Sequence, residues 1–126
     1  MKPIFAPAAA IAAALALTAC AGTGSVPTRQ QSGLLTNPAG MTLYVFDNDP
    51  AGTGKSVCNG DCAAKWPPLA AAETDRPGGD YSVVRRDDGS LQWAYKGKPL
   101  YLWIKDQKPG DATGDGVKGV WHTAKP

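Results

Sequence analysis

The segment YVFDND (residues 44–49) recurs as YLWIKD (residues 101–106), so the chain carries a Tyr-x-(Phe/Trp)-x-x-Asp motif twice. The same displacement of 57 residues carries Leu34 onto Leu91, Gly40 onto Gly97 and Leu43 onto Leu100. Similarity at one fixed offset indicates an internal duplication. We therefore expect two related units, at about residues 34–70 and 91–123. The repeated motif residues are Tyr44, Phe46, Asp49, Tyr101, Trp103 and Asp106.

Short apolar and aromatic runs separated by turn residues predict a mainly β fold. Residues 41–46 and 100–104 are the clearest strands, because their side chains suit a half-buried pleated surface. Each follows a turn-forming stretch, at residues 37–40 and 96–99, so each unit is expected to open as a hairpin. A further hairpin joins residues 81–86 to residues 91–95 through a turn at Asp87-Asp88-Gly89.

One short helix is expected at residues 61–66, with Asp61 as its N-cap and Pro67-Pro68 ending it. The predicted fold is thus a small single domain of antiparallel hairpins, built from two related repeat units, with one short helix. A chain of this length fits one such domain.

The N-terminus predicts export. Lys2 precedes an alanine-rich apolar run that ends in Leu17-Thr18-Ala19-Cys20, which is typical of a signal peptide over residues 1–19. Its last four residues resemble the lipobox of bacterial lipoproteins, in which the cysteine is acylated. The alternative is an ordinary secretory signal with a chance cysteine. If the lipobox is genuine, Cys20 is the anchor to membrane lipid, and several acyl chains on it would hold the protein stably.

Residues 20–31 form the expected lipidated cysteine and flexible tether, since they lack apolar periodicity. The globular domain is expected over residues 32–126. In an organism with two membranes, lipoprotein sorting rules associate an aspartate directly after the acylated cysteine with retention in the inner membrane. Here that position is Ala21. The outer membrane, facing the periplasm or the surface, is therefore favoured.

Further segments match a known family besides the two motif copies, namely residues 40–49, 56–68 with their CNGDC core, 88–95, 97–101 and 119–122. From Leu34 to His122 the chain resembles the predicted bacterial lipoproteins with a Yx(FWY)xxD motif, also called a secreted repeat of unknown function. The resemblance implies an envelope location and a duplicated repeat, and it supplies no reaction or catalytic residue. The second unit departs from the first by lacking a cysteine pair.

The repeated aromatic residues allow two interpretations. Tyr and Trp can form a stacking platform for sugars or other flat ligands. At positions i and i+2 of a strand, however, Tyr44 and Phe46 share one face, as do Tyr101 and Trp103. Two related aromatic pairs are what a small duplicated core needs, so we favour a core role. The motif aspartates are expected to accept backbone hydrogen bonds in the turns that follow.

Cys58 and Cys62 also allow two hypotheses. Exported thiols usually oxidise, which favours a disulfide. Alternatively the CxxxC pair binds copper(I) or carries electrons, with His122 or Met41 completing the site, since soft ligands suit that ion. No cofactor is predicted under the first hypothesis.

No catalytic motif of the common hydrolases or nucleotide-binding enzymes is present. Asp47 and Asp49 are expected at an exposed turn, which is unsuited to acid-base catalysis. The formal charge is only +2, and the one adjacent basic pair, Arg85-Arg86, precedes Asp87-Asp88 as in a solvated turn. We therefore expect a non-enzyme that binds or supports other envelope proteins or glycans, and no nucleic-acid partner.

Overall fold

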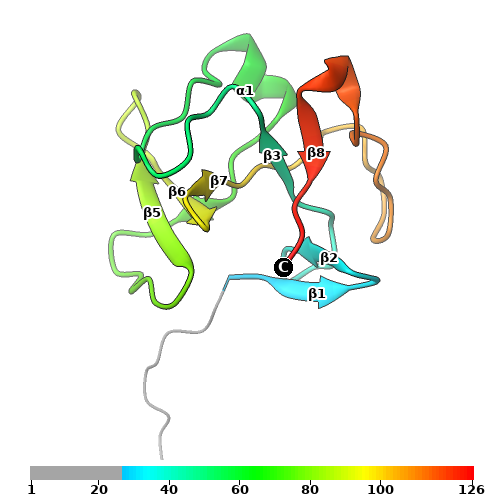
Figure 1. Ribbon diagram of the computed structural model, residues 1–126, viewed down its shortest axis with the longest axis horizontal. Helices are drawn as coiled ribbons and strands as arrows, with labels where there is room; N and C mark the ends of the chain where they lie inside the picture. The colour runs from blue at the N-terminus through cyan, green and yellow to red at the C-terminus, as the bar shows by residue number, and fades with distance from the viewer. Residues whose placement is uncertain (1–26) are drawn as a thin grey trace, which may run out of the picture.

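The computed structural model describes residues 27–126 (Figure 1). The predicted signal peptide, Cys20 and most of the predicted tether lie outside the described residues. Within the described range, no helix combines the length and apolar character that a membrane span requires.

The described chain is mainly β, as predicted, with small antiparallel sheets and one short α-helix (Figure 1). β1 pairs with β2, β3 pairs with β8, and β6 lies between β4 and β5 and also pairs with β7. The elements in chain order are β1 (Arg29–Gln31), β2 (Leu34–Thr36), β3 (Tyr44–Phe46), α1 (Asp61–Lys65), β4 (Ala70–Ala71), β5 (Tyr81–Arg85), β6 (Leu91–Tyr95), β7 (Lys98–Pro99), the 3₁₀ turn η1 (Val117–Gly119) and β8 (Trp121–Thr123).

The two copies of the motif meet at the first tyrosine of each. The backbone N–H of Tyr44 donates to the carbonyl of Tyr101 at 2.8 Å, and the N–H of Tyr101 donates to the carbonyl of Tyr44 at 2.9 Å. This reciprocal antiparallel bridge relates the two halves as a local two-fold axis would. The duplication seen in the sequence is therefore also a symmetry of the fold.

Each motif also pairs with the end of the other repeat. β3 runs antiparallel to β8, with Phe46 opposite Trp121. In the other half, the N–H of Leu102 donates to the carbonyl of Pro67 at 2.7 Å, and the N–H of Ile104 donates to that of Lys65 at 3.1 Å. The backbone of each motif is therefore hydrogen-bonded by the final segment of the other repeat and not by its own.

The strand predicted over residues 100–104 is not formed as a regular strand, and this expectation was wrong. Tyr101 makes only isolated bridges, to Tyr44 and to Pro68. Pro67 and Pro68 occupy the positions that His122 and Thr123 occupy in the other half. Proline has no N–H to donate to a ladder, so the pairing cannot continue as it does between β3 and β8.

The predicted hairpin of residues 81–86 and 91–95 is confirmed by the pairing of β5 with β6. Its turn places Gly89 at φ 89°, a conformation that favours glycine. The hairpins that open the two repeats differ in length by one residue. Leu43 donates to the carbonyl of Leu35 at 3.0 Å, and Leu100 donates to that of Trp93 at 2.9 Å.

Leu35 is therefore the structural equivalent of Trp93, at a displacement of 58 residues. The match of Leu34 to Leu91 suggested by the constant offset is wrong, because the loop of the first hairpin is one residue longer. After the loop the displacement of 57 residues holds, as Gly40 and Gly97 show. Both have positive φ, at 91° and 82°.

Two further boundaries differ from the sequence predictions. Residues 29–31, assigned to the tether, form β1, and Thr28 before them is buried. The helix is present, but its N-cap is Gly60, and Asp61 is its first residue rather than its cap. The helix ends at Lys65, ahead of the two prolines, for the reason expected.

The core has a mainly aliphatic part, which includes one tryptophan, and a mainly aromatic part. The aliphatic cluster contains Leu35, Leu43, Leu69, Trp93, Leu100 and Ala124. Its backbone repeats the two-fold relation, since Leu69 donates to the carbonyl of Leu100 at 2.9 Å and Ala124 donates to that of Leu43 at 2.8 Å. The aromatic cluster contains Tyr44, Phe46, Cys58, Trp66, Tyr101 and Trp121, and Cys62 of α1 and Val117 of η1 pack against it.

Because the repeats complete one another, cutting the loop between them should not separate them. We expect a chain with a protease site in the exposed loop of residues 73–79 to remain one species after cleavage. The pairing of β3 with β8 and of β4 with β6 still joins the halves. Native mass spectrometry of the cleaved protein tests this, with the same sample in urea as the control. Separation of the halves under native conditions would contradict the interlocked arrangement.

Candidate functional site

The motif tyrosines and aspartates bond across the two repeats. The hydroxyl of Tyr44 donates to Oδ2 of Asp106 at 2.6 Å, and the hydroxyl of Tyr101 donates to Oδ2 of Asp49. Both tyrosines are fully buried. The motif therefore locks one repeat to the other, which sequence reasoning missed because it assigned each aspartate to its own turn. The equal Tyr-to-Asp spacing in both copies was the available signal.

The second oxygen of each motif aspartate binds the segment that follows. Oδ1 of Asp49 accepts the N–H of Val57 at 2.7 Å. Oδ1 of Asp106 accepts the N–H of Thr113 at 2.9 Å and its hydroxyl at 2.6 Å. The expected backbone bonds are thus present, but the expected exposure of Asp49 is wrong, since only 1% of it is exposed.

Burial raises the pKa of Asp49, although its hydrogen bonds from Tyr101 and Val57 oppose this change. Burial also raises the pKa values of Tyr44 and Tyr101, and the hydrogen bonds to their aspartates raise them further. The two hydroxyls therefore stay protonated and act as donors.

The two buried Tyr–Asp pairs form a polar centre in the core. A buried arginine lies next to only one of them, the pair of Tyr101 and Asp49. Arg86, predicted to lie in a solvated turn, is instead buried, and its guanidinium donates to Oε1 of Gln92 at 2.7 Å. It also donates to Oγ of Ser56 at 2.9 Å and to the carbonyl of Cys58. Oγ of Ser56 lies 2.6 Å from the hydroxyl of Tyr101. The polar groups around the first aspartate are therefore engaged with one another.

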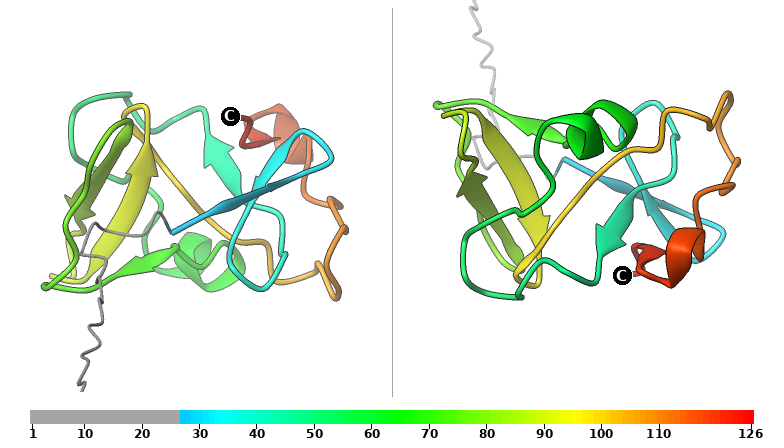
Figure 2. Two further views of the ribbon diagram at one scale, coloured as in Figure 1. Left: turned by 90° about the horizontal axis from the view of Figure 1, so that it is seen from below. Right: turned by 90° about the horizontal axis from the view of Figure 1, so that it is seen from above.

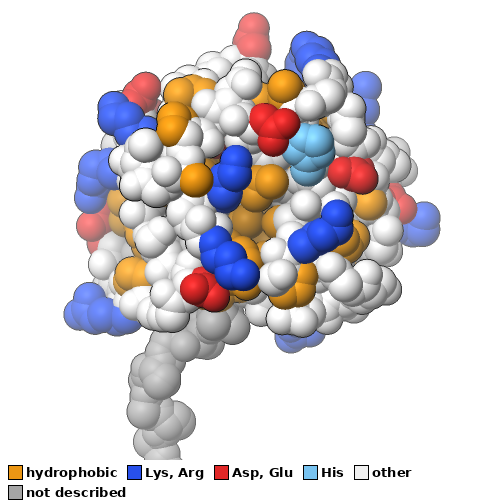
Figure 3. Space-filling model, viewed as in Figure 1, with side chains coloured by type: hydrophobic (Ala, Val, Ile, Leu, Met, Phe, Trp, Pro, Cys, Tyr) orange, Lys and Arg blue, Asp and Glu red, His pale blue; other side chains and the backbone are white. Residues whose placement is uncertain are grey.

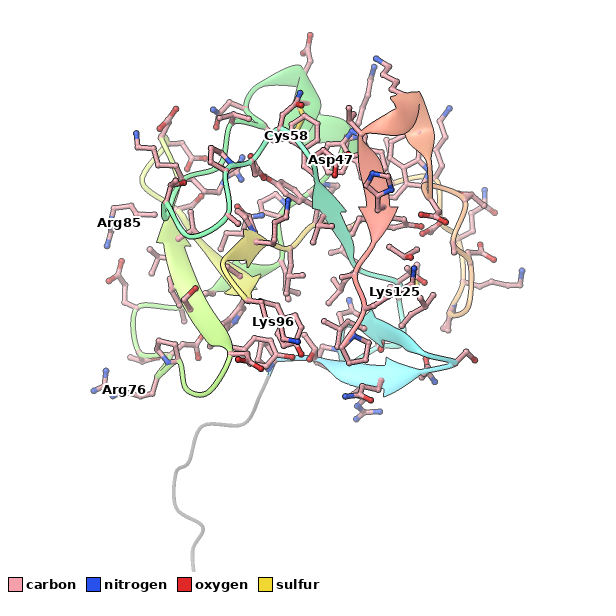
Figure 4. The ribbon with its side chains drawn as sticks, in the orientation of Figure 1. Asp47, Cys58, Arg76, Arg85, Lys96 and Lys125 are labelled. Carbon is pink, nitrogen blue, oxygen red and sulfur yellow. A yellow bond between two sulfur atoms is a disulfide. The ribbon has the colours of Figure 1, made fainter. Side chains whose placement is uncertain are left out.

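Cys58 and Cys62 form a disulfide, as the first hypothesis predicted. The copper hypothesis gains no support from the geometry. Nε2 of His122 lies 2.8 Å from Oδ2 of Asp47, which Figure 4 labels. Across residues 27–126, no group of three His, Cys, Asp or Glu side chains is placed to hold a metal ion. Met41 lies in the loop of the first hairpin, where its carbonyl accepts the N–H of Asn37.

Four aromatic rings form a continuous stack whose members alternate between the repeats. Phe46 lies 4.1 Å from Trp121, Trp121 lies 3.8 Å from Trp66, and Trp66 lies 4.0 Å from Trp103, measured between ring centroids. The interplanar angles in the same order are 8°, 4° and 25°. The expected core role is confirmed for Phe46, which is buried, while Trp103 at the end of the stack is only half-buried.

The motif tyrosines fix this stack from the side. The ring of Tyr44 meets Trp66 edge-on at 5.3 Å, and the ring of Tyr101 meets Trp121 edge-on at 5.1 Å. Such edge-to-face contacts are favourable because the positive edge of one ring meets the negative face of another. The same two tyrosines thus hold the polar centre and the aromatic stack together.

The stack lines a groove of about 490 Å³ between α1, residues 103–105 and η1. The view from above in Figure 2 shows α1 and η1 on either side of the chain that continues from β7. We call this the aromatic groove. Its lining residues are Phe46, Asn48, Asp61, Cys62, Lys65, Trp66, Trp103, Ile104, Lys105, Val117, Lys118, Val120 and Trp121.

Charge in the aromatic groove is predominantly positive, with Lys65, Lys105 and Lys118 against Asp61. By contrast, the face in Figure 3 carries acidic and basic side chains interspersed with small hydrophobic patches. Ile104, 53% exposed, adds apolar surface to the groove. Sequence reasoning did not identify this site, since its lysines are far apart in the chain.

The comparisons with known proteins now identify the family. The model of a family described as a secreted repeat of unknown function matches residues 25–70 and 82–125, one copy in each half of the fold. The chain belongs to this family, and the resemblance inferred from the motif is confirmed. No curated protein and no solved structure matches the chain.

Removing a motif hydroxyl should destabilise the fold. Tyr101→Phe removes the hydroxyl that donates to Oδ2 of the buried Asp49 and contacts Oγ of Ser56, so we expect a loss of about 1–3 kcal/mol in the free energy of unfolding. Tyr44→Phe should cost a similar amount, and urea denaturation measures both. Tyr95→Phe is the control, because its hydroxyl has no hydrogen-bond partner within residues 27–126. A Tyr101→Phe variant as stable as this control would refute the cross-repeat lock.

Proposed function

We propose that this protein is a lipid-anchored, non-catalytic binding module of the bacterial cell envelope, and that the aromatic groove is its binding surface. The secreted-repeat family supports an envelope or extracellular location. Cys20 supplies the lipid anchor, and in an organism with two membranes the outer membrane is favoured, because Ala21 rather than aspartate follows that cysteine. The partners proposed are other envelope components.

The aromatic groove is the observation that carries this proposal. The buried polar side chains that would otherwise suggest chemistry are committed to the fold. The motif tyrosines and aspartates bond one another, and the two cysteines form a disulfide. The groove instead presents an aromatic end, an exposed isoleucine and several lysines, as binding surfaces commonly do.

The position of the groove fits a tethered protein. The described chain enters at β1, on the lower side of the molecule in Figure 1, and the C-terminus lies on that side too. The aromatic groove lies on the opposite side, between α1 and η1. A tether joined to β1 therefore attaches on the side of the domain away from the groove.

A photocrosslinker in the groove tests the binding role. We expect p-benzoylphenylalanine at Ile104 to give a discrete adduct when intact cells are irradiated, because this side chain lines the groove and is 53% exposed. The matched control is the same crosslinker at Val57, which is 51% exposed and does not line the groove. Adducts of equal yield from both positions, or none from Ile104, would count against the groove as a binding surface.

The anchor is tested separately. We expect the wild-type protein to incorporate labelled palmitate and to fractionate with the envelope membranes, whereas Cys20→Ser should remain unlabelled and unprocessed at the lipobox. Cys62→Ser is the control, because its side chain lies in the folded domain and should not affect acylation. Palmitate incorporation by Cys20→Ser would exclude this anchor.

A further inference from the structure

At the half-buried end of the aromatic stack, a cation lies over a tryptophan ring. Trp66 covers one face of Trp103 at 4.0 Å, and Trp103 is half-buried in the wall of the groove. Nζ of Lys105 lies 5.9 Å from the centroid of the Trp103 ring. An indole held rigidly by stacking loses little freedom when a flat ligand binds, so it is a prepared contact surface.

The lysines of the groove favour an anion. Lys65 is the last residue of α1, Lys118 lies in η1, and Lys105 follows the exposed Ile104. Within residues 27–126, none of the three forms an ion pair. Asp61 is the acidic side chain in the same lining, so positive charge is in excess, and an excess of one sign along a cleft attracts ligands of the opposite sign.

The backbone beside the groove is already paired, which argues against an added peptide strand. The N–H of Ile104 donates to the carbonyl of Lys65 at 3.1 Å, and the N–H of Asp47 donates to that of Val120 at 2.8 Å. A peptide that extends a sheet needs unpaired backbone groups at an edge. These two N–H groups are therefore not free to pair with a peptide strand, and we assign recognition to the side chains that line the groove.

From these observations we propose that the aromatic groove binds an anionic saccharide. The apolar face of a sugar ring lies against Trp103 and Ile104, and its carboxylate or phosphate group lies among Lys65, Lys105 and Lys118. This inference deepens the proposed function and rests on it. It names the ligand class that a side-chain site with an aromatic surface and a positive rim recognises.

The test uses the mature full-length chain with Cys20→Ser, titrated by calorimetry and tryptophan fluorescence. The probes are a galacturonate oligomer, its methyl ester and a phosphorylated mannose oligomer. The ester keeps the sugar rings and removes the charge. We expect binding of the galacturonate to weaken at least about tenfold on esterification, a change of 1.4 kcal/mol. Binding should also weaken with added salt, since exposed charges are screened. If only the galacturonate binds, the recognised anion is a carboxylate. If only the phosphorylated oligomer binds, it is a phosphate.

Variants locate the site on the protein. Trp103→Ala and Lys105→Ser should each weaken binding about tenfold or more, which corresponds to 1.4 kcal/mol. Lys96→Ser is the matched control for Lys105→Ser, because Nζ of Lys96 also lies near an aromatic ring, 5.3 Å from Tyr95, and does not line the groove. If Trp103→Ala fails to fold, Lys105→Ser with Lys118→Ser carries the test.

Equal binding of the acid and the ester, or no loss in the Lys105→Ser variant, would overturn the anionic saccharide. If no saccharide binds but Ile104 crosslinks to a protein in cells, the ligand class is wrong and the binding role stands. If no saccharide binds and Ile104 gives no adduct, the proposed function fails as well.

Discussion

The rest of the structure depends on two buried hydrogen bonds, in each of which the motif tyrosine of one repeat donates to the motif aspartate of the other. A carboxylate removed from water is costly unless hydrogen bonds replace its hydration. Asp49 meets this requirement only with the hydroxyl of Tyr101 and the backbone of Val57, and Asp106 only with the other repeat's Tyr44 and with Thr113. Neither repeat can bury its aspartate alone, so the two must fold together.

The same tyrosines connect this polar centre to the surface. Their rings meet Trp66 and Trp121 edge-on, and these indoles stack in turn on Trp103 and Phe46. The shape of the aromatic groove is therefore set from inside the core. A rigid wall of this kind suits a binding surface, because its side chains are already ordered before a ligand arrives.

The two repeats differ where the chain no longer needs symmetry. The first unit has the disulfide, the buried Arg86 contacts and the Pro67-Pro68 pair. The second has β8, where the N–H of Thr123 donates to Oδ1 of Asp115 at 3.1 Å. The equivalent Pro68 has no N–H, so the first unit needs no such acceptor. Divergence thus follows which backbone groups each half must satisfy.

The sequence by itself determined the duplication, the β class, the short helix before two prolines and the hairpin at Gly89, because these depend on local composition and spacing. Only the tertiary structure decided that each motif aspartate serves the other repeat, that Arg86 is buried and that residues 100–104 do not form a strand. The tertiary structure also places Lys65, Lys105 and Lys118 in the same groove as Trp103. Such pairings depend on which distant segments meet, and a pattern of neighbouring residues carries no such information.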